Sequence, residues 1–146
     1  MQTSHKSYLY YLLSRREYSR FELLQKLKQR QVSEEESNIL LDELITSGWQ
    51  SDERFAECFC RAQLSKLRGS NRIYQAIMQK GIDKDTYEAT LSELEVNWSQ
   101  VARDCYVKKY RVYEPEEALP FDVQQKRIKY LIAQGFGFDV SKEVVG

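Results

Sequence analysis

Apolar residues recur at intervals of three and four along almost all of this 146-residue chain, and that spacing constrains its fold most. The only two prolines, Pro115 and Pro120, lie in one acidic stretch, so the rest of the sequence contains no strong helix breaker. Glu, Lys, Gln, Leu and Arg, which favour helix, are abundant. The sequence therefore predicts an all-α protein with an acidic linker at about residues 113–121.

Serine and glycine residues divide the periodic sequence into short helices. Ser19 and Ser33 each precede a glutamate by three residues, the spacing of a capping box at a helix start. Gly48 stands where a left-handed residue ends a helix. Phe21 and Ile45 are expected to face the core. The predicted helices span about residues 8–16, 20–30, 34–47, 52–67, 71–80, 84–94, 97–111 and 122–134, with a short one after Asp139.

The helical pattern itself recurs at offsets of 50 and 54 residues. The matching apolar positions are Leu24, Leu27 and Val32; then Tyr74, Ile77 and Ile82; then Ile128, Leu131 and Phe136. Gly81 and Gly135 also match, where the first group has Gln31. Three tandem three-helix repeats explain this best, stacked into an elongated, curved solenoid-like body; chance similarity between amphipathic helices is the alternative. The predicted repeats span residues 1–48, 49–96 and 97–146.

The sequence offers few residues suited to catalysis or metal binding. The single histidine, His5, lies in a polar N-terminal stretch that we expect to be mobile. Cys58, Cys60 and Cys105 are odd in number and lack a second ligand pair, so reduced thiols are expected in place of disulfides or a zinc site. We therefore expect neither an enzyme nor a bound metal or cofactor.

The apolar run at residues 8–13 bears on where the protein resides. It is too short to span a membrane and has no small-residue cleavage site after it. We expect a cytoplasmic protein, monomeric and without a membrane partner.

A formal net charge of zero hides strong segregation of charge. Residues 31–57 carry one basic and eight acidic side chains, whereas residues 58–82 carry five basic and no acidic ones. Folded helices can gather such basic blocks into a surface for phosphates or for an acidic protein. Ordinary solvated helix faces are the alternative for any single residue. The candidate binding residues are Arg15, Arg16, Arg20, Lys26, Arg61, Lys66, Arg68, Arg72, Lys80, Lys108, Lys109, Lys126 and Arg127.

Several short motifs occur in a fixed order along the chain. They are Leu12–Arg20 with Glu22-Leu23 and Leu27-Lys28, then Gly48–Ala56, then Arg68-Gly69 with Ile73, and finally Lys80–Asp83. No motif is specific by itself. Their order and spacing together resemble the RecX family, bacterial regulators of the RecA recombinase, over almost the whole chain. The resemblance implies tandem three-helix repeats, in agreement with the repeat pattern.

The resemblance also implies a function. RecX-like proteins are not enzymes; they bind the RecA filament on single-stranded DNA and inhibit recombinase and coprotease activity. They limit filament extension or promote disassembly in recombination, DNA repair and the SOS response. The implied partner is RecA in its filament, with direct DNA contact weak at most.

Two other functions remain open from the residues themselves. Short helices joined by tight turns can form an autonomous nucleic-acid-binding module, which would bind naked DNA tightly and with steep salt dependence. A helical array can also be a scaffold for an unrelated protein, because a fold by itself does not assign function.

Overall fold

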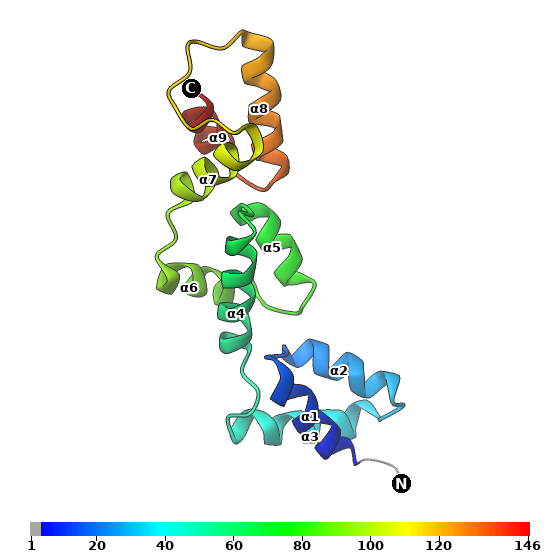
Figure 1. Ribbon diagram of the computed structural model, residues 1–146. Helices are drawn as coiled ribbons and strands as arrows, with labels where there is room; N and C mark the ends of the chain where they lie inside the picture. Colours follow the sequence, from blue (N-terminus) through cyan, green and yellow to red (C-terminus); the bar gives the residue numbers. More distant parts are fainter. Residues whose placement is uncertain (1–3) are drawn as a thin grey trace. The chain divides into compact units, whose positions relative to one another are not determined.

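The computed structural model describes residues 4–146, and this part of the chain consists of helices joined by turns and one longer loop (Figure 1). The described residues contain no strand, so the all-α prediction is confirmed. The helices are α1 (His5–Arg15), α2 (Arg20–Gln29), α3 (Glu34–Thr46), α4 (Asp52–Ser65), α5 (Ser70–Met78), α6 (Lys84–Leu94), α7 (Trp98–Tyr110), α8 (Phe121–Ala133) and α9 (Phe138–Val145). The predicted acidic linker is the loop between α7 and α8.

Side-chain caps fix most helix starts where the sequence predicted them. The Ser19 hydroxyl accepts a hydrogen bond from the Glu22 N–H, and the Glu22 carboxylate accepts one from the Ser19 N–H, which completes a capping box. The Ser33 hydroxyl accepts a hydrogen bond from the Glu36 N–H in the same way. These caps satisfy backbone donors that a helix leaves unpaired in its first turn.

The start of α1 corrects one prediction. The Ser4 hydroxyl accepts a hydrogen bond from the Ser7 N–H, so α1 begins at His5, three residues before the expected Tyr8. His5 is therefore helical, not part of a mobile tail. Its Nδ1 accepts a hydrogen bond from Arg30 Nε at 3.2 Å, and this contact joins α1 to the end of α2.

Contacts within the chain define two compact units. Unit 1 comprises the described residues up to Phe59 together with Ile77–Thr90, and unit 2 comprises Cys60–Ala76 together with Leu91–Gly146. Helices α4, α5 and α6 each contribute residues to both units.

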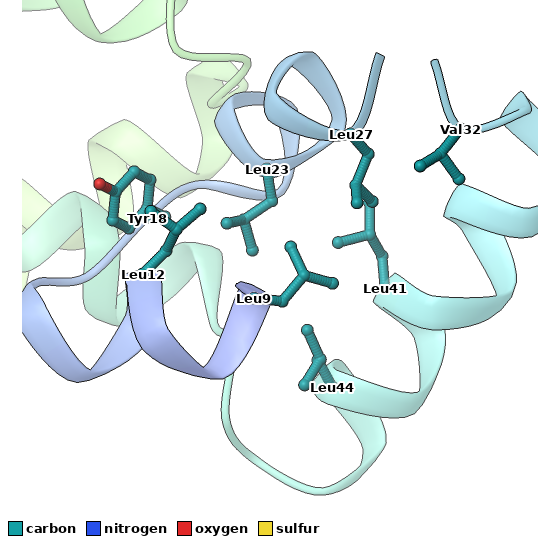
Figure 2. Close-up of a cluster of buried hydrophobic side chains, with 8 residues drawn as sticks. All are labelled: Leu9, Leu12, Tyr18, Leu23, Leu27, Val32, Leu41 and Leu44. Carbon is teal, nitrogen blue, oxygen red and sulfur yellow. The ribbon is translucent and has the colours of Figure 1, made fainter. Parts of the chain in front are cut away.

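The core of unit 1 is formed mainly by leucines of α1, α2 and α3. Leu9 of α1 is fully buried, and Figure 2 shows it among leucines directed toward it from α2 and α3. The buried cluster is Leu9, Leu12, Tyr18, Leu23, Leu27, Val32, Leu41 and Leu44.

Phe21 and Ile45, both expected in this core, are 42% and 41% exposed. Leu23 is buried in place of Phe21. The two residues are two positions apart in α2, and this separation turns their side chains about 200° from one another around the helix axis. Ile45 is displaced from the buried face because it follows Leu44 by one residue, about 100°.

A second core lies in unit 2, where α9 packs against both α7 and α8. Its buried members are Ala102, Cys105, Tyr106, Leu131, Phe136 and Val144, and half-buried Leu67 packs against them. Leu67 follows α4, so this packing joins the segment after α4 to α7 and α8.

Two glycine turns make close contacts that no larger residue would allow. In unit 2, the Gly69 N–H donates to the Gln134 carbonyl at 2.8 Å, and the Asn71 N–H donates to the Gly135 carbonyl at 3.0 Å. A Cβ on Gly69 would lie 2.2 Å from the Gly135 carbonyl carbon. Gly135 also has φ of +104°, a conformation that favours glycine. We call this contact the Gly69–Gly135 joint.

Unit 1 contains a matching contact at the repeat offsets. A Cβ on Gly81 would lie 2.5 Å from the Phe21 Cβ. Beside it, Lys80 Nζ lies 3.4 Å from Glu22 Oε2. The residues at these offsets in unit 2 are Gln134 and Arg72, and they too are paired.

Gln31 occupies the matching position in the first group of helices. It has φ of +62°, so the left-handed turn is kept without glycine. Its side chain is exposed. Glycine is therefore needed at this position only where another segment approaches the turn closely.

The substitution Gly135→Ala should destabilise the protein by about 2–5 kcal/mol, because the methyl group adds a backbone clash to a left-handed conformation. Gly48→Ala is the matched control. Gly48 has φ of +81° but nothing within 4 Å of a Cβ, so only the conformational cost of about 1–2 kcal/mol remains. Urea unfolding measures the free energy of unfolding of both variants. Equal losses of stability would contradict a close backbone contact at Gly135.

Candidate functional site

Two of the candidate binding residues in unit 1 share one internal partner. Arg16 NH2 lies 3.1 Å from Glu22 Oε2, and Lys80 Nζ lies 3.4 Å from the same oxygen. The Arg16 guanidinium also stacks 3.6 Å from the centre of the Tyr18 ring. Arg16 and Lys80 therefore stabilise the fold by neutralising Glu22.

This arrangement shifts the pKa of Glu22. Burial raises the pKa of the carboxyl group, but the hydrogen bonds from Arg16 and from the Ser19 N–H, with the positive charges of Arg16 and Lys80, outweigh it. The pKa of Glu22 therefore lies below its ordinary value, and the charged form stabilises the folded state.

The other unit 1 candidates bind separate partners or none. Arg20 donates from its guanidinium to Asn38 Oδ1 at 2.9 Å, and its N–H donates to Asp52 Oδ1 at 2.9 Å. Arg15 NH1 donates to the Tyr11 hydroxyl at 2.9 Å. Half-buried Lys26 forms no ion pair with any described residue.

In unit 2, Arg72 and Arg127 likewise bind partners within the protein. Arg72 NH1 donates to Gln134 Oε1 at 2.8 Å, beside the Gly69–Gly135 joint. Arg127 NH1 donates to the Tyr106 hydroxyl at 2.6 Å and to Glu116 Oε1 at 3.0 Å.

Three further candidates differ in exposure. Arg61 of α4 and Lys126 of α8 are exposed, whereas Arg68, between α4 and α5, is half-buried. Several of the candidate cations thus bind partners within the protein.

Three candidates from distant parts of the sequence do come together. Lys66, Lys108 and Lys109 line one hollow of about 330 Å³, together with Arg111. We call this hollow the basic pocket. Its other lining residues are Leu67, Cys105, Tyr130 and Gln134. Four cations thus meet around a concave surface whose lining contains no carboxylate.

Two left-handed turns shape the rim of the basic pocket. Leu67, after α4, has φ of +59°, and Arg111, after α7, has φ of +55°. The Arg111 N–H donates to the Val107 carbonyl at 2.7 Å, which closes the end of α7. A non-glycine residue in this conformation costs about 1–2 kcal/mol, so surrounding packing must hold both turns in place.

The charge of the basic pocket comes from its four cations. Burial raises the pKa of the Cys105 thiol, although contact with Tyr130 and the charge of Lys108 oppose the shift. Burial and the neighbouring Cys105 also raise the pKa of the Tyr130 hydroxyl. Both groups are therefore neutral at pH 7, and the pocket can attract an anion without internal compensation.

Five pocket residues were not among the predicted binding residues: Leu67, Cys105, Arg111, Tyr130 and Gln134. Arg111 follows Lys108 by three residues, a spacing that places both on one side of a helix end. Tyr130 and Gln134 show the same signal at an interval of four. Their proximity to Lys66, however, depends on the folded chain.

No group of three or more His, Cys, Asp or Glu side chains within residues 4–146 is placed to hold a metal ion. Burial raises the pKa of the Cys60 thiol to about 11, which disfavours a reactive thiolate there. Across the same residues, no helix is long and apolar enough to cross a membrane.

Comparison with known proteins identifies similar sequences along nearly the whole chain. Two family models match, "RecX, first three-helix domain" at residues 6–44 and "RecX, second three-helix domain" at residues 51–91. A Haemophilus influenzae (strain PittEE) protein named "Regulatory protein RecX" is 36% identical over 141 residues, covering 96% of this chain and 91% of the relative. A Chromobacterium violaceum protein of the same name is 40% identical over 136 residues, covering 92% and 84%.

Solved structures show the same fold. The crystal structure of RecX from Lactobacillus salivarius gives a TM-score of 0.81 at 20% identity, covering 97% of this chain and 92% of that one. A second crystal structure of a regulatory protein RecX gives 0.77 at 24% identity, covering 96% and 72%. At these identities the likeness concerns the fold alone.

The substitution Glu22→Gln should destabilise the protein by roughly 1–2 kcal/mol at pH 7, because Arg16 and Lys80 lose their shared anion. The pKa of Glu22 is depressed in the folded state, so its stabilisation is present above the unfolded pKa and is lost as pH falls through the folded value. Chemical unfolding from pH 7 to pH 3 should show the difference from wild type shrinking below about pH 4.

Glu143→Gln supplies the control, since Glu143 is exposed on α9 and forms no ion pair with a described residue. Its effect should stay near zero throughout. A Glu22→Gln loss that does not change with pH would count against the ion pairs.

Proposed function

The chain belongs to the RecX family, and we propose that it regulates RecA by binding the RecA filament on single-stranded DNA. Binding inhibits the recombinase and coprotease activities of RecA, by limiting filament extension or by promoting disassembly. The protein acts by binding and does not catalyse a reaction, in line with relatives that are named regulatory proteins.

The basic pocket supports this proposal most directly, because it identifies the residues that would bind the filament. A nucleoprotein filament presents phosphates along its DNA and acidic side chains on its protein surface. A concave site with Lys66, Lys108, Lys109 and Arg111 and no carboxylate in its lining focuses positive potential on one place. Such a site favours a multiply anionic surface over a single small anion.

The exposure of the pocket cations supports the same conclusion. Lys66, Lys108, Lys109 and Arg111 are all exposed, and none forms an ion pair with a described residue. Their charges are available to a partner without breaking an internal ion pair. Arg16, Lys80 and other paired cations would have to leave partners within the protein.

The repeat organisation belongs to the same proposal. We place the three repeats at residues 1–48, 49–96 and 97–146. The separate matches of two three-helix family models to residues 6–44 and 51–91 support the first two repeats. The matched pairs Lys80 with Glu22 and Gln134 with Arg72 support the offsets between all three.

The double substitution Lys66→Glu with Lys108→Glu should raise the concentration needed to inhibit RecA-driven ATP hydrolysis by roughly tenfold or more, because it reverses two of four pocket charges. The assay measures ATP hydrolysis by RecA from the same organism on a long single-stranded DNA. The two lysines suit this test better than Arg72, since Arg72 donates to Gln134 beside the Gly69–Gly135 joint.

Lys142→Glu is the control for a charge reversal elsewhere in unit 2, because Lys142 is exposed on α9 and lies outside the pocket lining. It should inhibit RecA as wild type does. If the double variant keeps its helicity and inhibits RecA as the wild type does, the pocket is not part of the binding surface. Tight binding to naked DNA without any effect on RecA would favour an autonomous nucleic-acid-binding module, and failure to recover RecA in a pull-down would favour another protein partner.

A further inference from the structure

After Arg111, the loop between α7 and α8 carries three glutamates and no further basic residue. We call residues 112–120 the acidic strap; they have no helical structure and arch between the two helices (Figure 1). Glu116 Oε1 lies 3.0 Å from Arg127 NH1. Within the described chain, this is the one side-chain hydrogen bond or ion pair that residues 112–120 form.

Arg127 is held in position by more than the strap. Its guanidinium lies 4.5 Å from the centre of the Tyr110 ring and 5.6 Å from that of Tyr106. It also donates to the Tyr106 hydroxyl at 2.6 Å. The side chain is only 17% exposed, against 35% for Glu116. The tyrosines therefore orient the guanidinium independently of Glu116, with donors left for an anion.

The Arg127 position is continuous with the basic pocket. The rings of Tyr110 and Tyr130 meet edge to face at 5.8 Å, and Tyr130 lines the pocket. Lys109 Nζ lies 5.1 Å from the centre of the Tyr130 ring. A row of three tyrosines thus joins Arg127 to the pocket cations, all within unit 2.

The acidic strap packs loosely. It borders a hollow of about 650 Å³ whose other walls include Arg103 and Val107 of α7 and Val144 of α9. Tyr113, next to the first glutamate, is 76% exposed. Because a partly exposed ion pair contributes little net stability, Glu116 can leave Arg127 at small cost.

We propose that Arg127 is a phosphodiester-binding position that Glu116 occupies in the free protein and that a phosphate oxygen occupies when nucleic acid lies across the basic pocket. The inference rests on the proposed function, since the nucleic acid is that of the filament. Arg suits this exchange because its planar fork matches carboxylate and phosphate oxygens alike. The strap is thus an internal competitor that weakens binding to free nucleic acid.

The test is binding of a fluorescently labelled 30-nucleotide oligo-dT by fluorescence anisotropy over a range of salt concentrations. Glu116→Gln should bind at least about threefold more tightly than Glu143→Gln, which makes the same change in net charge at an exposed site of unit 2. Its slope of log Kd against log salt should be steeper by about 0.7, the value for one added single-strand phosphate contact. In the Glu116→Gln background, Arg127→Gln should remove both gains.

Equal gains for Glu116→Gln and Glu143→Gln would overturn the inference, as would a gain that persists without Arg127, or no oligonucleotide binding by any variant at low salt. Circular dichroism checks the fold of the Arg127 variant, and the comparison of the two glutamate variants does not depend on it. Inhibition of RecA by the wild-type protein is measured separately. If the wild-type protein does not inhibit RecA but the oligonucleotide results are as predicted, the proposed function alone is contradicted.

Discussion

The backbone contact between Gly69 and Gly135 positions the parts of unit 2 on which the candidate site depends. It ties the start of α5 to the turn after α8 through two backbone hydrogen bonds. Lys66 and Leu67 immediately precede this contact, and Gln134 belongs to it. The joint therefore brings a cation that follows α4 beside the cations at the end of α7. Without it, the basic pocket would lose one wall.

The cations of the chain divide into two groups with different physical roles. Arg16, Lys80 and Arg72 lie beside internal partners, where removing one partner leaves a polar group unsatisfied. Lys66, Lys108 and other pocket cations have no such partner and point their charge at solvent. Arg127 belongs to the first group, but its carboxylate partner Glu116 lies on the loosely packed acidic strap. A zero net charge is thus compatible with one strongly basic surface.

Local signals predicted the helices well and their buried faces less well. The helix predicted at residues 84–94 has the same bounds as α6. Its start was predictable because Asp83 caps it, accepting a hydrogen bond from the Thr86 N–H at 2.8 Å. The predicted burial of Phe21 and Ile45 was wrong because a shift of one or two residues moves a side chain off the buried face. The prediction that His5 is mobile was wrong because Ser4, which caps α1, lacks the glutamate that marks a capping box.

The candidate site was predictable only in its components. Lys66, Lys108 and Lys109 stood out as cations, but their meeting depends on the packing of segments about 40 residues apart in the sequence. The direct test is photo-crosslinking from the basic pocket on the RecA filament, with benzoylphenylalanine at position 108 or, for comparison, at position 142. Strong crosslinks from position 108 and few from position 142 are the predicted result. Crosslinks of equal strength from both positions, or none from position 108, would contradict the account.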